Sequence, residues 1–186
     1  SNLLDNIHLR GDSLDKPPRG CILYLPLSYS AEDFSGEGND GTIHGATWVD
    51  GKLGKALGFD GENDYVDIDF LSDVQEWDEL TVFVWVKLLS TPDDVRDSYI
   101  GSPAWGTEGG FLVYTGTNVN VRARLRNDPL DTEIDCVFED NVLNEWRQYT
   151  FVFNRPILKT YVNGEWTGNQ KTWDYPVRTD GHIYLG

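Results

Sequence analysis

A short segment of the chain, Asp33-Phe-Ser-Gly-Glu-Gly-Asn-Asp-Gly41, gathers oxygen-bearing side chains and glycines into nine residues. Carboxylate, amide and backbone carbonyl oxygens are the ligands that calcium prefers. We therefore expect a structural calcium ion here, with Asp33 as the main side-chain ligand, Asn39 and Asp40 next, and glycine carbonyl oxygens completing the shell. The alternative is a glycine-rich turn in which aspartate and serine side chains cap backbone amides.

A second set of carboxylates, Glu133, Asp135 and Glu139, recurs along one predicted strand. Two carboxyl groups that cleave a glycosidic bond lie about 5.5 Å apart in retaining enzymes and about 6.5–9.5 Å apart in inverting ones. At a rise of about 3.3 Å per residue, Glu139 lies about 20 Å from Glu133 and about 13 Å from Asp135, even though alternation places all three on one face. We assign no catalytic residue, and a polysaccharide hydrolase or lyase is kept only as an alternative that needs a partner on another strand.

Aromatic residues in turn-rich segments are the other candidates for chemistry. An exposed indole or phenol can stack on the apolar face of a sugar ring while neighbouring polar groups bond to its hydroxyls. The alternative is that these rings pack long loops onto the fold. We expect a ligand-binding role for Trp105, Trp166, Trp173 and Tyr175. Two further tryptophans, Trp85 and Trp146, lie in strand patterns, and we expect them in the core.

Three arginines, Arg122, Arg124 and Arg126, alternate along one predicted strand and form a basic row in an acidic chain. They could pair with acidic residues across the strand or receive an acidic sugar. We include Arg122 and Arg124 among the candidate ligand-binding residues.

Composition limits the classes of partner. The net charge of −16 repels nucleic acid at long range, and no apolar run approaches the roughly 18 residues of a membrane span. We therefore expect a glycan or an extracellular protein as partner, without nucleic acid and without membrane insertion. The two cysteines, Cys21 and Cys136, form either one long-range disulfide or two free thiols.

Short apolar segments separated by glycine, asparagine, aspartate or proline recur through most of the chain, which is typical of an all-β sandwich. Residues 80–87 give the sharpest strand; because both of its faces are largely apolar, we expect a central strand covered on both sides. Only residues 71–79 show a faint helical spacing. The expected strands fall in residues 21–27, 42–49, 56–59, 65–68, 80–88, 111–114, 119–125, 134–138, 148–153, 158–162 and 182–185.

Five blocks together carry a family resemblance. They are Asp33 to Gly41, Gly45-Ala-Thr-Trp-Val49, Gly51 to Val66 with its Phe59-Asp60-Gly61 and Asp64-Tyr65-Val66 segments, Leu80-Thr-Val-Phe-Val-Trp-Val86, and Asn144 to Phe153 followed by Tyr161-Val-Asn-Gly-Glu165. In this order they resemble the laminin-G-like jelly rolls of the concanavalin A-like lectin and glucanase superfamily. The resemblance implies an antiparallel β-sandwich, and loops like residues 33–41 often hold structural calcium in that family.

The resemblance covers residues 20–186, and we expect residues 1–19 to form an arm or linker. The family usually continues with a further strand that carries an aspartate, so we expect the last strand to be missing here. These features predict a lectin-like, carbohydrate- or ligand-binding module without catalytic activity, extracellular or on a cell or virion surface, and part of a larger protein such as an adhesin. A structural or protein-interaction domain of the same fold is the second hypothesis.

Overall fold

The computed structural model describes residues 17, 19–69, 75–90, 97–102, 110–116, 120–127, 130–140, 142–179 and 181–186. These residues contain no α-helix, and every pairing between named strands is antiparallel. None of them forms a helix of the length and apolar character that a membrane crossing needs. The strands are β1 (Gly41–His44), β2 (Thr47–Asp50), β3 (Lys55–Gly58), β4 (Tyr65–Asp69), β5 (Gln75–Trp77), β6 (Glu79–Lys87), β7 (Asp97–Gly101), β8 (Gly110–Thr115), β9 (Asn120–Asn127), β10 (Thr132–Asp140), β11 (Trp146–Asn154), β12 (Ile157–Val162), β13 (Glu165–Thr172), β14 (Val177–Thr179) and β15 (His182–Leu185).

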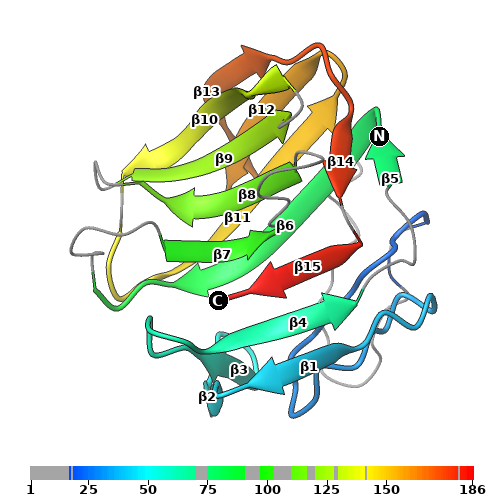
Figure 1. The fold of residues 1–186 in the computed structure, drawn as a ribbon. Helices are drawn as coiled ribbons and strands as arrows, with labels where there is room; N and C mark the ends of the chain where they lie inside the picture. The colour runs from blue at the N-terminus through cyan, green and yellow to red at the C-terminus, as the bar shows by residue number, and fades with distance from the viewer. Residues whose placement is uncertain are drawn as a thin grey trace.

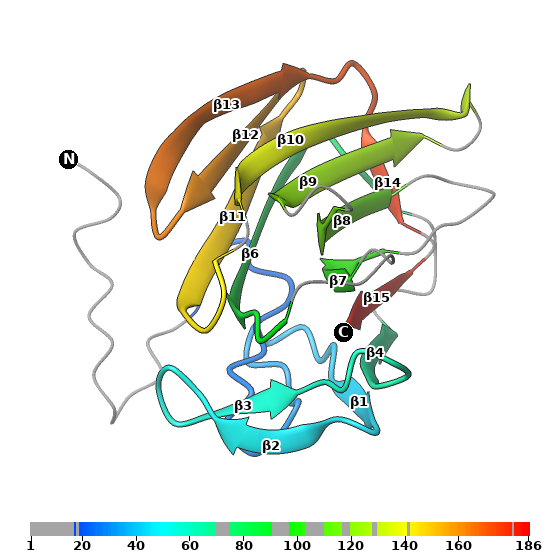
Figure 2. The same ribbon diagram turned by 90° about the vertical axis from the view of Figure 1, so that its left-hand side faces the viewer.

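Two sheets face each other (Figures 1 and 2). The larger has seven strands in the order β1-β4-β15-β7-β8-β9-β10, and the smaller has four in the order β13-β12-β11-β6. Two short ribbons, β2-β3 and β5-β14, complete the described sheets. This arrangement confirms the predicted antiparallel sandwich.

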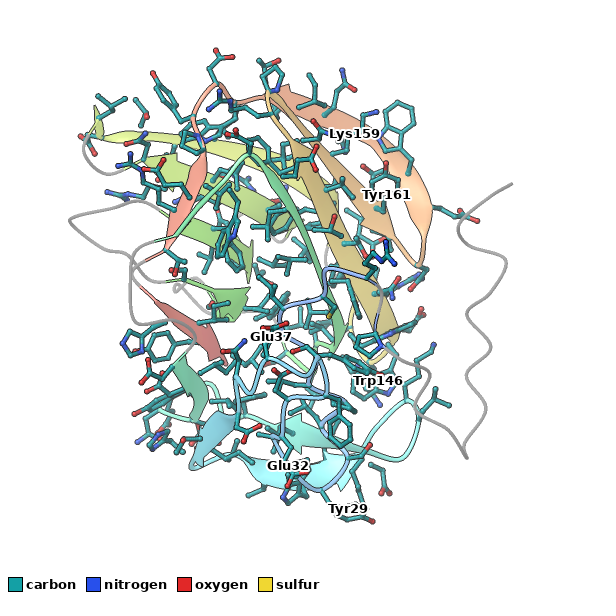
Figure 3. All side chains as sticks on the ribbon, turned by 90° about the vertical axis from the view of Figure 1, so that its right-hand side faces the viewer. Tyr29, Glu32, Glu37, Trp146, Lys159 and Tyr161 are labelled. Carbon is teal, nitrogen blue, oxygen red and sulfur yellow. The ribbon has the colours of Figure 1, made fainter. Side chains whose placement is uncertain are left out.

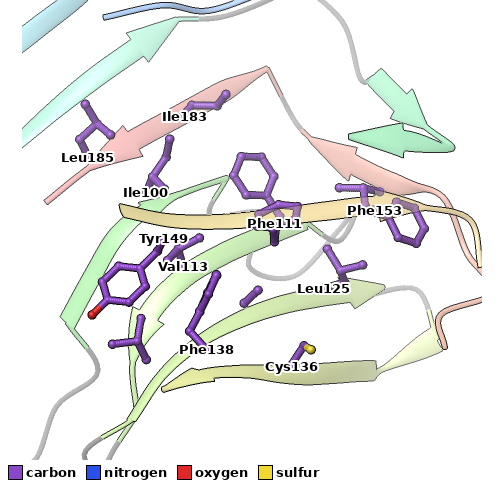
Figure 4. Close-up of a cluster of buried hydrophobic side chains, with 14 of the residues drawn as sticks. Ile100, Phe111, Val113, Leu125, Cys136, Phe138, Tyr149, Phe153, Ile183 and Leu185 are labelled. Carbon is purple, nitrogen blue, oxygen red and sulfur yellow. The ribbon is translucent and has the colours of Figure 1, made fainter. Parts of the chain in front are cut away.

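The core lies between the two sheets, as Figure 4 shows. Phe111 of the large sheet and Phe151 of the small sheet meet with ring centroids 5.7 Å apart, and Phe138 meets Tyr149 edge-on at 5.2 Å. All four side chains are at most 3% exposed. At about 25 cal/mol per Å² of apolar surface, such rings supply much of the free energy that holds the sheets together.

The turn between β12 and β13 follows directly from its sequence. Asn163 and Gly164 both have positive φ angles, 51° and 83°. They join strands in which Val162 pairs with Glu165, so the loop has two residues. Positive φ at both positions is typical of a type I′ hairpin turn, which favours Asn-Gly. The turn places Trp166 two residues after the loop, as the second residue of β13.

Several expectations were wrong. Residues 21–27 form no strand; Leu23, Leu25 and Leu27 pack against the core without a strand partner. The expected helical turn is replaced, in its described part, by strand β5. Among the described strands, β6 pairs only with β11 and is therefore the edge of its sheet rather than a central strand. The choice that the sequence left open for the cysteines is settled as two free thiols.

Candidate functional site

The outer face of the four-stranded sheet carries a row of aromatic rings. Strand register places Phe83 opposite Thr150, Thr150 opposite Tyr161, and Tyr161 opposite Trp166. Directly opposed residues of antiparallel strands point to the same face. With strands about 4.8 Å apart, this row crosses the whole sheet and spans about 14 Å from Phe83 to Trp166.

The ends of this row are open to solvent. Phe83 is 48% exposed and Trp166 is 55% exposed, while Tyr161 between them is partly exposed. Figure 3 shows Tyr161 and Lys159 close together on β12, with Trp146 further down the same sheet. Large apolar side chains gathered on one open face mark an interaction surface more often than a packing surface.

Trp85 and Trp146 also belong to this outer face. Trp85 pairs with Gln148, one row from Phe83, and Trp146 pairs with Lys87 one row further on. The inward positions of the same strands are taken by Val84, Val86 and Tyr149. The prediction that both tryptophans are core residues is therefore wrong: alternation along β6 and β11 turns them away from the opposing sheet. We call Phe83, Trp85, Tyr161 and Trp166 the aromatic face.

Hydrogen-bonding groups lie between and beside these rings. Thr150 sits within the aromatic row, and Gln148 and Gln170 lie in the rows on either side of it. The backbone NH of Gln148 donates to Asn163 Oδ1 at 3.0 Å, which holds the amide of Asn163 at the hairpin end of the face. Flat rings with interspersed hydroxyl and amide groups suit a ligand that has both an apolar face and many hydroxyls.

A hollow of about 410 Å³ adjoins the face at its hairpin end. This volume falls within the range of small-molecule sites, about 300–1,000 Å³. Trp166 belongs both to the hollow and to the aromatic face, so the two surfaces are continuous. Its indole NH is directed to the carbonyl of Asn169, at 3.4 Å. The lining residues are Phe138, Glu139, Arg147, Val162, Asn163, Glu165, Trp166 and Thr167.

Glu139 reaches this hollow because of a β-bulge. Val137 pairs with Arg122 but Glu139 pairs with its neighbour Val121, so β10 holds one extra residue here. Since Val121 is buried in the core, Glu139 is turned to the inner side of its sheet, where Tyr149 Oη donates to it at 3.4 Å. Burial, with the charge of Glu139, raises the pKa of Tyr149. The prediction that Glu139 shares a face with Glu133 and Asp135 is therefore wrong.

The arginines predicted as a basic row form ion pairs with carboxylates of the neighbouring strand. Arg124 donates to Asp135 through Nε at 2.7 Å and Nη2 at 2.8 Å, and also forms an ion pair with Glu133 at 3.0 Å. Arg122 reaches Asp135 at 3.2 Å. We call Arg122, Arg124, Arg126, Glu133 and Asp135 the arginine cluster; it lies on the outer face of the large sheet. Of its two predicted roles, the structure shows the pairing with acidic neighbours.

Asp135 is the centre of that cluster. Besides the arginines, Tyr114 Oη donates to its carboxylate at 3.0 Å. Burial alone would raise the pKa of Asp135, but the hydrogen bonds and charge of Arg124, helped by Tyr114 and Arg122, outweigh burial and hold that pKa below its usual value. Burial and the charge of Asp135 in turn raise the pKa of Tyr114 to about 12. The carboxylate thus stays ionised and holds together charges that would otherwise be buried unpaired.

In the expected calcium loop, backbone and serine donors bond to the Asp33 carboxylate. It accepts from the backbone NH groups of Tyr24, Ser35 and Asn39 at 2.9, 2.9 and 3.0 Å, and from Ser35 Oγ at 2.6 Å. Burial opposes ionisation, but these bonds lower the pKa of Asp33. Asp40 accepts from the Asp33 NH, and the Asn39 amide donates to the Ile22 carbonyl. This is the capped turn of the alternative hypothesis; calcium at Asp33, Asn39 and Asp40 stays a prediction.

The other predicted aromatic residues fall in different environments. Trp173 is only 5% exposed and belongs to the core, so the prediction that it offers a ring to a ligand is wrong. Tyr175 is 36% exposed and meets Trp173 edge-on at 5.2 Å, away from the described aromatic row. Trp105 lies outside the described residues. Of the four predicted aromatic residues, the structure places Trp166 on the aromatic face.

Sequence reasoning missed Phe83, Trp85 and Tyr161. The signal was present in residues 80–87, where valines alternate with larger aromatic side chains. Such a strand fits burial on both faces and fits a one-sided strand with an aromatic binding surface equally well. A long side chain at position 87, Lys87, ends the outward-facing set and favours the second interpretation.

The stacked antiparallel sheets and the absence of α-helix among the described residues define a lectin-like β-sandwich. The chain belongs to the concanavalin A-like lectin/glucanases superfamily, because that family model matches residues 60–186. A search of curated protein sequences found no match.

Three solved structures are similar to this chain, and the first of them shows the same fold. Domain 4 of AbnA, a GH43 extracellular arabinanase from Geobacillus stearothermophilus in complex with arabinotriose, is 18% identical with a TM-score of 0.58, over 85% of this chain and 88% of that chain. A heptameric SAP-like pentraxin from Limulus polyphemus is 12% identical (TM-score 0.47, 66% and 57% covered). The carbohydrate-binding module CBM66 from Bacillus subtilis is 11% identical (TM-score 0.41, 78% and 90% covered).

Proposed function

We propose that this chain is a carbohydrate-binding module that holds a glycan against the aromatic face. The observation that carries the proposal is the row of rings from Phe83 through Tyr161 to Trp166, which is open to solvent at both ends. Sugar rings would stack on these side chains through their CH faces, and Thr150, Gln148 and Gln170 would bond to hydroxyls. An extended row suits a chain of several sugar units lying across the sheet.

The likeness to domain 4 of AbnA supports this proposal, since that domain was solved with arabinotriose. We further propose that the module is non-catalytic and belongs to a larger secreted or surface protein, in line with the extracellular enzyme that contains domain 4. The turning of Glu139 away from Glu133 and Asp135 supports a non-catalytic role, because it separates the carboxylates of β10 further. A structural calcium ion at Asp33 is part of the same proposal.

A second candidate function uses the same surface. Exposed apolar rings also bind proteins, so the aromatic face could contact an extracellular protein or a neighbouring domain. The exposure of Phe83 favours this alternative, because phenylalanine offers a ligand no hydrogen bond. The two functions differ in whether a free polysaccharide binds.

Affinity electrophoresis through gels that contain single polysaccharides tests the proposal. The panel includes debranched arabinan, xylan, dextran, polygalacturonate and dextran sulfate. We expect at least one of them to retard the wild type and Trp166→Ala to lose that retardation. Tyr65→Ala is the matched control, because the Tyr65 ring is 37% exposed and lies on β4 of the large sheet. If none of the polysaccharides retards the wild type, the protein-contact function replaces glycan binding.

A further inference from the structure

Three lysines lie on or beside the aromatic face. Lys159 Nζ is 5.8 Å from the centroid of the Trp166 ring, and Lys52 Nζ is 4.3 Å from the centroid of Trp85. Lys87 is exposed and lies one row from Trp85, opposite Trp146. Lys52 comes from the turn between β2 and β3, so the small ribbon reaches across to the outer face of β6. Cations this close to aromatic rings are attracted to them and are held in position.

These lysines form no ion pair among the described residues. Within the described part of the chain, no carboxylate lies at ion-pair distance from Lys52, Lys87 or Lys159. Of the five rows on the outer face, the four that carry the rings and these lysines contain no aspartate or glutamate; Glu79 lies in the fifth row, where the Asn154 amide donates to it. In these four rows, the residues that lie opposite one another across the strands are Lys87-Trp146, Trp85-Gln148, Phe83-Thr150-Tyr161-Trp166 and Thr81-Val152-Lys159-Gln170. By contrast, Lys55 on the same small ribbon is bonded to Asp50 at 2.7 Å.

This absence is unusual for a chain with 31 acidic and 15 basic residues. The net charge repels a polyanion from the molecule as a whole. At physiological salt, however, charges are screened over about 8 Å, so an anion in contact with this face interacts mainly with the lysines around it. The local charge of the face is thus opposite in sign to that of the whole protein.

We propose that the glycan held by the aromatic face is anionic, with carboxylate or sulfate groups that bind Lys52, Lys87 and Lys159 while its rings stack on Trp166, Tyr161 and Phe83. This inference rests on the proposed function and names the charge class of its ligand. It also moves the acidic-sugar site from the arginine row to the opposite sheet. The arginines are neutralised by Asp135 and Glu133, whereas the lysines keep their charge available for a ligand.

Two matched pairs of probes test the charge class and separate its two sources. Polygalacturonate is compared with its methyl ester, and dextran sulfate with dextran, by affinity electrophoresis of the full chain. We expect the acidic member of at least one pair to bind at least tenfold more tightly than its neutral counterpart. Preference for polygalacturonate identifies carboxylate as the recognised group, and preference for dextran sulfate identifies sulfate.

Matched variants then locate the effect. Lys52→Gln/Lys159→Gln should weaken binding of the acidic probe about fivefold, as expected for two partly exposed ionic contacts. Lys55→Gln/Lys171→Gln changes the net charge equally, from the same small ribbon and the same sheet, and should leave binding unchanged. Equal losses in both variants, or equal binding of acidic and neutral probes, would overturn the inference. Equal binding that Trp166→Ala abolishes would overturn only the charge class and leave glycan binding intact.

Discussion

Both outer faces of this sandwich carry basic residues, but the basic residues of the two faces differ in whether they form ion pairs. On the large sheet, the arginines of the cluster are paired with carboxylates: Arg122 and Arg124 both bind Asp135, and Arg124 also pairs with Glu133. On the small sheet, Lys52 and Lys159 lie beside aromatic rings, and no carboxylate among the described residues is at ion-pair distance from them. A basic row in a sequence therefore says little about ligands until its acidic partners are known. The arginine cluster is neutralised within the fold, whereas the lysines of the small sheet have no such described partner.

The largest change in stability is expected from a substitution in the arginine cluster. Asp135→Ala removes the carboxylate that binds Arg122 and Arg124 and leaves Arg124, 7% exposed, with Glu133 as its remaining described ion-pair partner. We expect the free energy of unfolding to fall by about 3 kcal/mol, since breaking a buried ion pair strands a charge. Denaturant titration measures this. A loss under 1 kcal/mol would show that the cluster contributes little to stability.

A substitution on the aromatic face should change glycan affinity much more than stability. Trp166→Ala removes a ring that is 55% exposed, so the free energy of unfolding should change by no more than about 0.5 kcal/mol. Glycan affinity should fall at least tenfold, or about 1.4 kcal/mol. Gel retardation and denaturant titration of the same variant measure both quantities. A large loss of stability with unchanged affinity would reverse the roles that we assign to the two faces.

Acidification should reduce the contribution of Asp135 to the stability of the fold. The pKa of Asp135 is lowered in the folded state, so its stabilising contribution is present above the unfolded value of about 3.9 and is lost as the pH falls through the folded pKa. The stability difference between the wild type and Asp135→Asn should therefore be constant near neutral pH and shrink below about pH 4. Denaturant titrations from pH 7 to pH 3 follow it. A difference that grows on acidification would contradict the assigned direction of the shift.

The smallest effect concerns the Asp33 loop, which lies on neither face. If calcium is bound there, the melting temperature of the wild type should fall by several degrees in EDTA, because an ion bound only to the folded state stabilises it. Asp33→Asn should remove that response. If hydrogen bonds alone hold the loop, the wild type melts at one temperature with and without EDTA, and the calcium prediction is wrong.

Local sequence patterns predicted those parts of the fold that depend on neighbours in the chain. Alternation in residues 80–87 gave a strand, and Asn163-Gly164 gave the hairpin, because both depend on backbone preferences of adjacent residues. The edge position of β6 depends on which strands assemble beside it. Nothing in the strand itself distinguishes an apolar face under a second sheet from an apolar face left open for a ligand.

The candidate site was predicted only in part for the same reason. Trp166 was identified because it follows a recognisable turn, but its neighbours Phe83 and Tyr161 come from strands far away in the sequence. The inward turn of Glu139 depends on a bulge that appears only when β10 is paired with β9. Trp173 resembled a loop ligand because its surroundings are polar, yet its backbone NH donates to the Pro156 carbonyl at 2.7 Å and its ring enters the core.

The most direct test of the aromatic face is a titration followed by the indole NH signals of the seven tryptophans in a ¹H–¹⁵N NMR spectrum. The added ligand is the trisaccharide of whichever polysaccharide retards the wild type most, and single Trp→Phe variants assign the signals. We predict that the Trp166 signal shifts with saturation while the signal of buried Trp173 does not. Saturable binding that leaves Trp166 unchanged would contradict the assignment of the glycan site to this face.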